Sequence, residues 1–129
     1  MSTEDVVRKA IECYNRGDAD TVSALLHDDI RSCIHADAET GPYHTDCAGK
    51  GAFWKAIERI QADWKIDDYR LTDIIVSGDR AAAQIGVKMT SRHTGASREI
   101  ELALFITVKD DRVVKLHEYH DTAAAARAR

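Results

Sequence analysis

The sequence of 129 residues has only three cysteines and one proline, and it has no excess of basic charge. No apolar run approaches the roughly 20 residues that a membrane-spanning helix needs. With 18 Lys and Arg against 22 Asp and Glu, the net charge of -4 argues against broad binding of nucleic-acid phosphates. The first ten residues are acidic and polar, where a signal peptide would be basic and then apolar. We therefore expect a cytoplasmic protein, and the composition names no activity.

The three cysteines, Cys13, Cys33 and Cys47, are odd in number and contain no C-x-x-C motif. A secreted disulfide scaffold of this size would carry an even and denser set. The cysteines are therefore expected to be reduced thiols in or near the core. The chain is also short enough that residues 1–129 are expected to form a single domain.

Three helices are predicted before most of the strands. Ser2 and Asp5 have capping-box spacing, and apolar residues at helical spacing follow until Gly17 ends the first helix. Asp18 is placed to cap a shorter second helix that runs to residue 26. A third helix is predicted from residues 49–51 to about residue 64.

The strands have clear turn signals between them. Strands are predicted at residues 30–35, 68–76, 81–89, 98–108 and 113–120, and the last four are joined by short turns. Short turns between consecutive strands imply an antiparallel meander, so the fold class is α+β. The polar segment Ala36–Cys47 is expected to lack regular structure over most of its length and to act as a lid or mouth. Residues 122–129 are expected to be a frayed tail.

The strand at residues 99–108 has two apolar faces. Its even positions are all large and aliphatic, and its odd positions include Ala103 and Phe105. Residues two apart share one face of a sheet, so an apolar second face suggests that something covers it. A homodimer through the sheet is the simplest cover, and burial under the tail or the long loop is the alternative.

Several short motifs, in order, resemble one known superfamily. They are YNRGD at 14–18, ALLHDD at 24–29, GKGAFW at 49–54, VSGDRA at 76–81 and VVKLHEYHDT at 113–122. Together they resemble the nuclear transport factor 2-like superfamily, in its SnoaL-like and ketosteroid-isomerase-like branch. The resemblance implies a cystatin-like roll, in which a cone-shaped, curved antiparallel sheet wraps around three N-terminal helices and leaves a cavity. Its members include isomerases, epoxide hydrolases, polyketide cyclases, dehydratases and non-catalytic binding domains, so the fold does not fix the function.

The sequence lacks residues that two known activities of the superfamily require. On the family pattern, the base of the ketosteroid isomerases falls at Ile34, and their two oxyanion donors fall at Ala10 and Ala103. All three residues are apolar, so that activity is not expected. The epoxide hydrolases pair two carboxylates with an arginine. Glu101 and Glu118 could supply the carboxylates, but no arginine is suitably placed.

The resemblance further implies that Leu116, Glu118 and His120 of the last strand face the cavity. A glutamate and a histidine two residues apart on a strand share a face and could exchange a proton, and an apolar cavity would raise the glutamate pKa. The alternative is that Glu118 pairs with a basic group at the rim and that His120 is solvated. His35 is expected as a further polar lining residue with a catalytic role. Asp121 is either another acid–base candidate or a cap for the tail.

The aromatic residues Tyr14, Trp54 and Trp64 are expected to contact a ligand, with ordinary core packing as the alternative. Glu101 and Phe105 are further candidates for ligand contact. No metal site is expected, because His117 and His120 point to opposite faces of a strand and Zn²⁺ needs three or four convergent ligands.

The sequence leaves three hypotheses open. The first is a cofactor-free acid–base enzyme of the isomerase, cyclase, dehydratase or hydrolase type that acts on a neutral apolar metabolite. The second is a pocket that binds such a molecule without chemistry. The third is a dimerisation module with a filled cavity.

Overall fold

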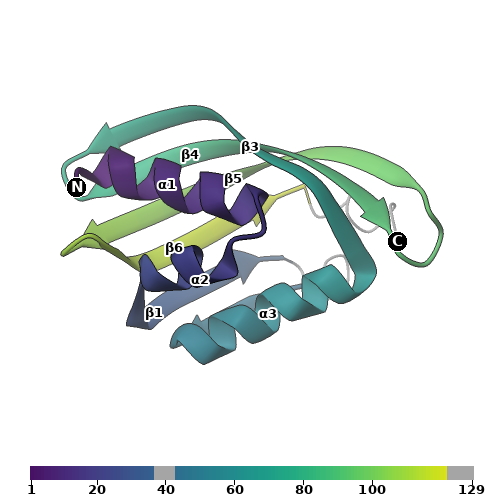
Figure 1. Ribbon diagram of the computed structural model, residues 1–129, viewed down its shortest axis with the longest axis horizontal. Helices are drawn as coiled ribbons and strands as arrows, with labels where there is room; N and C mark the ends of the chain where they lie inside the picture. Colours follow the sequence, from purple (N-terminus) through teal and green to yellow (C-terminus); the bar gives the residue numbers. More distant parts are fainter. Residues whose placement is uncertain (37–42, 122–129) are drawn as a thin grey trace.

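A computed structural model describes residues 1–36 and 43–121 of the chain (Figure 1). Its helices and strands follow in the order α1 (Thr3–Asn15), α2 (Ala19–Ala24), β1 (Leu26–His35), β2 (Thr45–Ala48), α3 (Lys50–Asp63), β3 (Trp64–Ser77), β4 (Arg80–Ser91), β5 (Ser97–Lys109) and β6 (Arg112–His120). The predicted α+β class is confirmed, although β1 and β2 come between the second and third helices.

The strands form one curved six-stranded sheet in the order β2-β1-β6-β5-β4-β3. The antiparallel meander predicted from the short turns is confirmed for β3 to β6. β1 is parallel to β6: the chain passes through β2 and α3 to β3 at the opposite edge of the sheet, and the meander then returns it to the side of β1. This parallel pairing aligns Cys33 with His117 and His35 with Tyr119.

Three boundaries differ clearly from those expected from the sequence. β1 begins at Leu26 and β3 begins at Trp64, each four residues before the predicted start. Thr45–Ala48 forms β2 at the end of the segment expected to lack regular structure. β2 pairs with the open edge of β1, so that polar backbone groups of both strands find partners. Tertiary pairing therefore overrides the polar composition of this short strand. Residues 37–42 of the expected lid and residues 122–129 of the expected tail lie outside the described residues.

The helix termini follow their sequence signals. The backbone N–H of Asp5 donates to the Ser2 hydroxyl at 3.0 Å, and the Ser2 N–H donates back to the Asp5 carboxylate at 3.2 Å, which completes the predicted capping box. Asp18 caps α2 through the N–H of Thr21 at 3.1 Å. Gly49 precedes α3 with a φ of 93°, a conformation that favours glycine.

The core lies between the helices and the concave face of the sheet. Figure 1 shows α1 and α2 over one face of the sheet, with α3 running below them. On β5, Leu102, Leu104, Ile106 and Val108 are buried against this core, whereas Phe105 on the outer face is exposed. The large aliphatic residues at even positions therefore face the core, and the mixed residues at odd positions face outward, as the alternation of the strand predicts.

The three cysteines form no disulfide; Cys13 is buried, and Cys33 and Cys47 are partly buried. Within residues 1–36 and 43–121, no helix is both long enough and apolar enough to cross a membrane.

Candidate functional site

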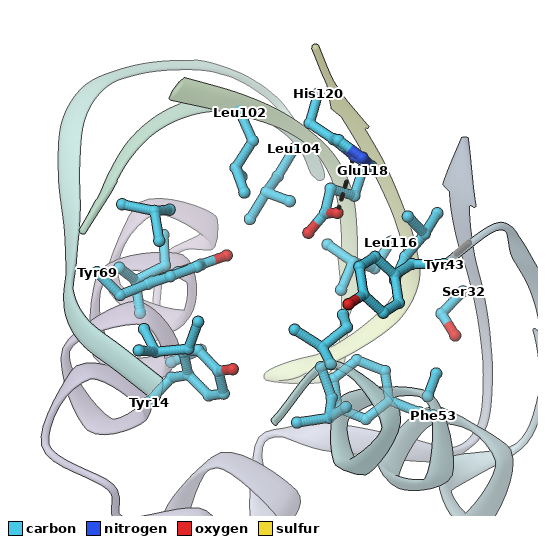
Figure 2. A pocket seen from close by; sticks show the side chains of 18 of the residues that line it. Tyr14, Ser32, Tyr43, Phe53, Tyr69, Leu102, Leu104, Leu116, Glu118 and His120 are labelled. Carbon is cyan, nitrogen blue, oxygen red and sulfur yellow. Dashed lines mark ion pairs between the residues drawn. The ribbon is translucent and has the colours of Figure 1, made fainter. Parts of the chain in front are cut away.

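A cavity of about 170 Å³ lies between the helices and the concave face of the sheet. Its wall is mostly apolar and includes Ala10 and Phe53 from the helices and Leu102, Leu104 and Leu116 from the sheet (Figure 2). Such a site suits an apolar ligand, because small-molecule sites combine an apolar wall with a few polar groups that fix the orientation.

A small set of polar side chains interrupts this apolar wall. Tyr14 comes from α1, Tyr69 from β3, and Glu118 and His120 from β6. In Figure 2 the hydroxyl groups of the two tyrosines and the carboxylate of Glu118 point into the same space from opposite sides. The arrangement places two hydroxyl donors and one carboxylate around the position that a ligand would occupy.

The two tyrosines support one another. Their rings pack edge to face, with centroids 4.8 Å apart, and the backbone N–H of Tyr69 donates to the Asn15 side chain at 2.8 Å. These contacts tie the end of α1 to β3 and fix the direction of both rings.

Burial is the main cause that raises the pKa of both tyrosines, and the negative charge of Glu118 raises each pKa further. An interaction with the Gln61 side chain opposes the shift at Tyr14, whereas the Tyr69 pKa is raised well above its usual value of 10.0. Near neutral pH both hydroxyls therefore keep their protons and act as hydrogen-bond donors.

Glu118 and His120 lie on the same face of β6, as the strand alternation predicts. Nδ1 of His120 is 3.4 Å from a carboxylate oxygen of Glu118, and the two side chains are only 6% and 19% exposed respectively. The contact has the distance of an ion pair but not the alignment of a hydrogen bond, so Nδ1 has no hydrogen-bond partner among the described residues.

Tyr43 closes another side of the cavity. Its side chain is buried, and its hydroxyl donates to the Asp63 carboxylate at 2.8 Å, at the end of α3. The other oxygen of the same carboxylate is 2.8 Å from Nε2 of His93. This chain of contacts holds the segment after the undescribed residues 37–42 against the third helix.

Five of the residues singled out from the sequence line this cavity, namely Tyr14, Trp64, Leu116, Glu118 and His120. Two expected lining residues lie elsewhere, because the strand alternation directs them outward. His35 stacks on Tyr119 on the outer face of the sheet, with ring centroids 4.2 Å apart. Phe105 also points outward and is 47% exposed.

Trp54 and Glu101 are likewise absent from the cavity wall. The indole N–H of Trp54 donates to the Ser23 hydroxyl at 3.3 Å, and the neighbouring Phe53 faces the cavity in its place. Glu101 lies on the outer face, where it accepts a hydrogen bond from Gln84 at 3.1 Å.

The structure also shows where the three positions compared with the ketosteroid isomerases lie. Ala10 and Ile34 line the cavity, as the resemblance implies, but Ala103 does not. Leu102 and Leu104, on either side of it, face the cavity instead. The donor position that the family pattern puts at Ala103 is therefore displaced by one residue. The side chains that face the cavity there, Leu102 and Leu104, are also apolar and cannot donate a hydrogen bond to an oxyanion.

Sequence reasoning missed Tyr69. A register shift in β3 lies between Ile66 and Asp68, so that both Ile66 and Tyr69 face the cavity although they are three residues apart. A regular strand would direct them to opposite faces. No feature of the sequence pattern identified this bulge, which becomes visible only in the pairing with β4.

Comparisons with known proteins agree with this architecture. A family model described as the SnoaL-like domain matches residues 7–116. No curated protein matches the sequence significantly.

Solved structures share the fold at low sequence identity. A nuclear transport factor 2-like protein of unknown function from Burkholderia pseudomallei superposes with a TM-score of 0.89 at 21% identity, covering 99% of this chain and 98% of that one. A candidate polyketide cyclase from Pseudomonas putida has a TM-score of 0.81 at 20% identity, with coverage of 99% and 98%. A candidate isomerase from Rhodopseudomonas palustris has a TM-score of 0.76 at 19% identity, with coverage of 94% and 91%.

Proposed function

The chain belongs to the SnoaL-like domain family, and we propose that its cavity binds a small, neutral, apolar carbonyl compound and moves a proton on it without a cofactor. The observation that carries the proposal is the arrangement of Glu118, Tyr14 and Tyr69 around one apolar space. A carboxylate base and hydroxyl donors are the groups that enolisation needs.

The size of the cavity limits the substrate. An engineered protein cavity of roughly 150 Å³ holds a benzene molecule. The 170 Å³ here therefore suits a compound with one six-membered ring or a chain of similar volume. A charged anion is disfavoured, because the wall is apolar and Glu118 already contributes negative charge.

The proposed chemistry uses the residues in complementary roles. The Glu118 carboxylate removes a proton from a carbon next to the carbonyl, and the Tyr14 and Tyr69 hydroxyls donate hydrogen bonds to the enolate oxygen that forms. The protonated Glu118 then returns the proton to another carbon of the substrate or to a leaving group. His120, beside Glu118, positions the carboxylate and stabilises its charged form when the imidazole is protonated.

The test uses cyclohex-3-en-1-one as the probe and follows its conversion to cyclohex-2-en-1-one. The wild-type protein should catalyse the conversion, and Glu118→Gln should slow it by at least about 100-fold, the lower range for a lost acid–base group. Glu101→Gln is the matched control, because Glu101 lies on the outer face. Equal rates for the wild type and Glu118→Gln would overturn the assignment of Glu118.

Non-catalytic binding is the second candidate, and the nearly continuous apolar wall supports it. It predicts that cyclohexenone raises the melting temperature of the wild type and of Glu118→Gln alike, with no conversion in either. Under this hypothesis the cavity holds an apolar metabolite, and Glu118 fixes its orientation.

We also propose that the chain forms a dimer, whichever of these two functions it has. The second copy packs against the outer face of the sheet. The register aligns Ile75, Ala82 and Phe105 in one row across β3, β4 and β5. The exposed Ile75 and Phe105 in this row supply apolar surface that a second copy could cover.

A further inference from the structure

A second cluster of reactive side chains lies on β1 and β6, and of its three members only Cys33 also borders the cavity. Cys33 and His117 are direct neighbours across the parallel pair β1–β6, and His35 is two residues beyond Cys33 on the same face. The Cys33 sulfur and one ring nitrogen from each histidine all lie within 4.8 Å of one another. All three side chains are partly exposed, so an ion from solvent could reach them.

The two histidine rings are held in place by their surroundings. Nε2 of His35 is 2.8 Å from Nδ1 of His117, and the His35 ring stacks on Tyr119 at an interplanar angle of 4°. Tyr119 in turn packs edge to face against Phe105. Such packing orients ligands before a metal arrives, as surrounding residues do in metal sites.

We propose that Cys33, His35 and His117 bind one Zn²⁺ ion through Sγ, Nε2 and Nδ1 respectively. A thiolate with two imidazoles is a donor set that suits Zn²⁺ and excludes the hard cations Mg²⁺ and Ca²⁺, which prefer oxygen ligands. Three protein ligands leave the fourth tetrahedral position for water or another ligand.

The present distances require only small movements. Zn–S and Zn–N bonds of about 2.3 and 2.0–2.1 Å separate tetrahedral ligand atoms by roughly 3.3–3.6 Å. The two histidine nitrogens must therefore move apart from 2.8 Å, and the widest separation in the cluster must close from at most 4.8 Å. Side-chain rotation can supply both changes while the strand pairing stays fixed.

Binding also requires a defined rearrangement of protons. The Cys33 thiol releases its proton to the buffer as the Zn–S bond forms. One of the two hydrogen-bonded histidine nitrogens carries a proton, and that ring must move it to its other nitrogen before both rings can bind the ion. No redox change or additional reactant is involved.

The neighbouring charges act in both directions. Asp46, aligned with Cys33 across β1–β2, places a carboxylate beside the cluster that attracts a cation, although Arg31 lies 3.9 Å from the same carboxylate. Lys115, two residues before His117 on β6, repels a cation.

Cobalt(II) is the probe, because it replaces Zn²⁺ in such sites and gives visible absorption when it is tetrahedral and a thiolate-to-cobalt band in the near ultraviolet. Wild-type protein titrated with Co²⁺ should develop both signals at one ion per chain, and Zn²⁺ should displace them. Cys33→Ser should abolish the thiolate band, and His117→Gln should weaken binding by at least about tenfold, the lower limit even for loss of an outer-shell partner.

Cys47→Ser and His27→Gln are the matched controls, since neither residue belongs to the cluster, and both variants should keep the wild-type signals. Circular dichroism of each variant checks that the fold is retained. Absence of the thiolate band in the wild-type protein, its survival in Cys33→Ser, or its loss in Cys47→Ser would overturn the proposal. Because the readout is the absorption of bound Co²⁺, these outcomes do not depend on the ketone assay.

Discussion

Nδ1 of His120 lies 3.4 Å from a carboxylate oxygen of Glu118 without forming a hydrogen bond to it. Both side chains are largely shielded from solvent, so the negative charge of Glu118 is weakly screened inside the cavity. The charge reaches Tyr14 and Tyr69 across the cavity and raises the pKa of each hydroxyl. The carboxylate and the two tyrosines are therefore coupled electrostatically as well as placed together.

Replacing Glu118 should change the titration of the tyrosines. Glu118→Gln removes the negative charge that contributes to both shifts, so the Tyr14 and Tyr69 pKa values should fall. Burial remains as the larger cause, so the values should stay above 10.0. Carbon NMR of ring-labelled tyrosine at increasing pH measures the change. Glu101→Gln is the control, and an unchanged Tyr14 titration in Glu118→Gln would contradict the coupling.

Alkaline pH should destabilise the folded protein through the same tyrosines. Above pH 10 the unfolded chain loses the phenolic protons while the folded state retains them, so stability falls as pH rises toward the folded-state pKa. Each tyrosine can contribute up to about 1.4 kcal/mol per pH unit. Urea unfolding at several pH values measures the slope. Tyr69→Phe should flatten it, and an unchanged slope in that variant would contradict the expected contribution of Tyr69.

Truncation of a side chain in the core between the helices and the sheet should lower the stability of the protein. Ile85 is completely buried, so Ile85→Ala should lower the free energy of unfolding by about 2–5 kcal/mol. Val76→Ala is the control on the neighbouring strand, because Val76 is 37% exposed and its truncation should cost no more than about 0.5 kcal/mol. Urea unfolding measures both, and equal losses would contradict the placement of the core.

The outer face should determine the oligomeric state. We expect the wild-type chain to sediment as a dimer and Phe105→Asp to sediment as a monomer, because a charge in the apolar row would be buried without a partner. Lys55→Asp, on the exposed surface of α3, is the control and should leave the dimer intact. Sedimentation velocity decides the matter, and a monomeric wild-type chain would contradict the proposal.

Local signals in the sequence predicted most of the elements. The Ser2–Asp5 capping box, the Asp18 cap and the turns between β3 and β6 depend on residues that are close in the chain, so a single sequence can reveal them. Alternation along β6 also predicted that Glu118 and His120 share a face. By contrast, β2 was missed because its order comes from pairing with β1 rather than from its own composition.

The sequence by itself determined the α+β class, the helix ends, the meander and the shared face of Glu118 and His120, because each follows from periodicity or from capping and turn residues. That this face points into the cavity was implied only by the family resemblance. Only the tertiary structure decided which side chains meet. The bulge in β3 turns Tyr69 toward Glu118, and the parallel pairing of β1 with β6 places the outward-pointing His35 and Cys33 beside His117. Both depend on strand register between distant segments, which no local pattern encodes.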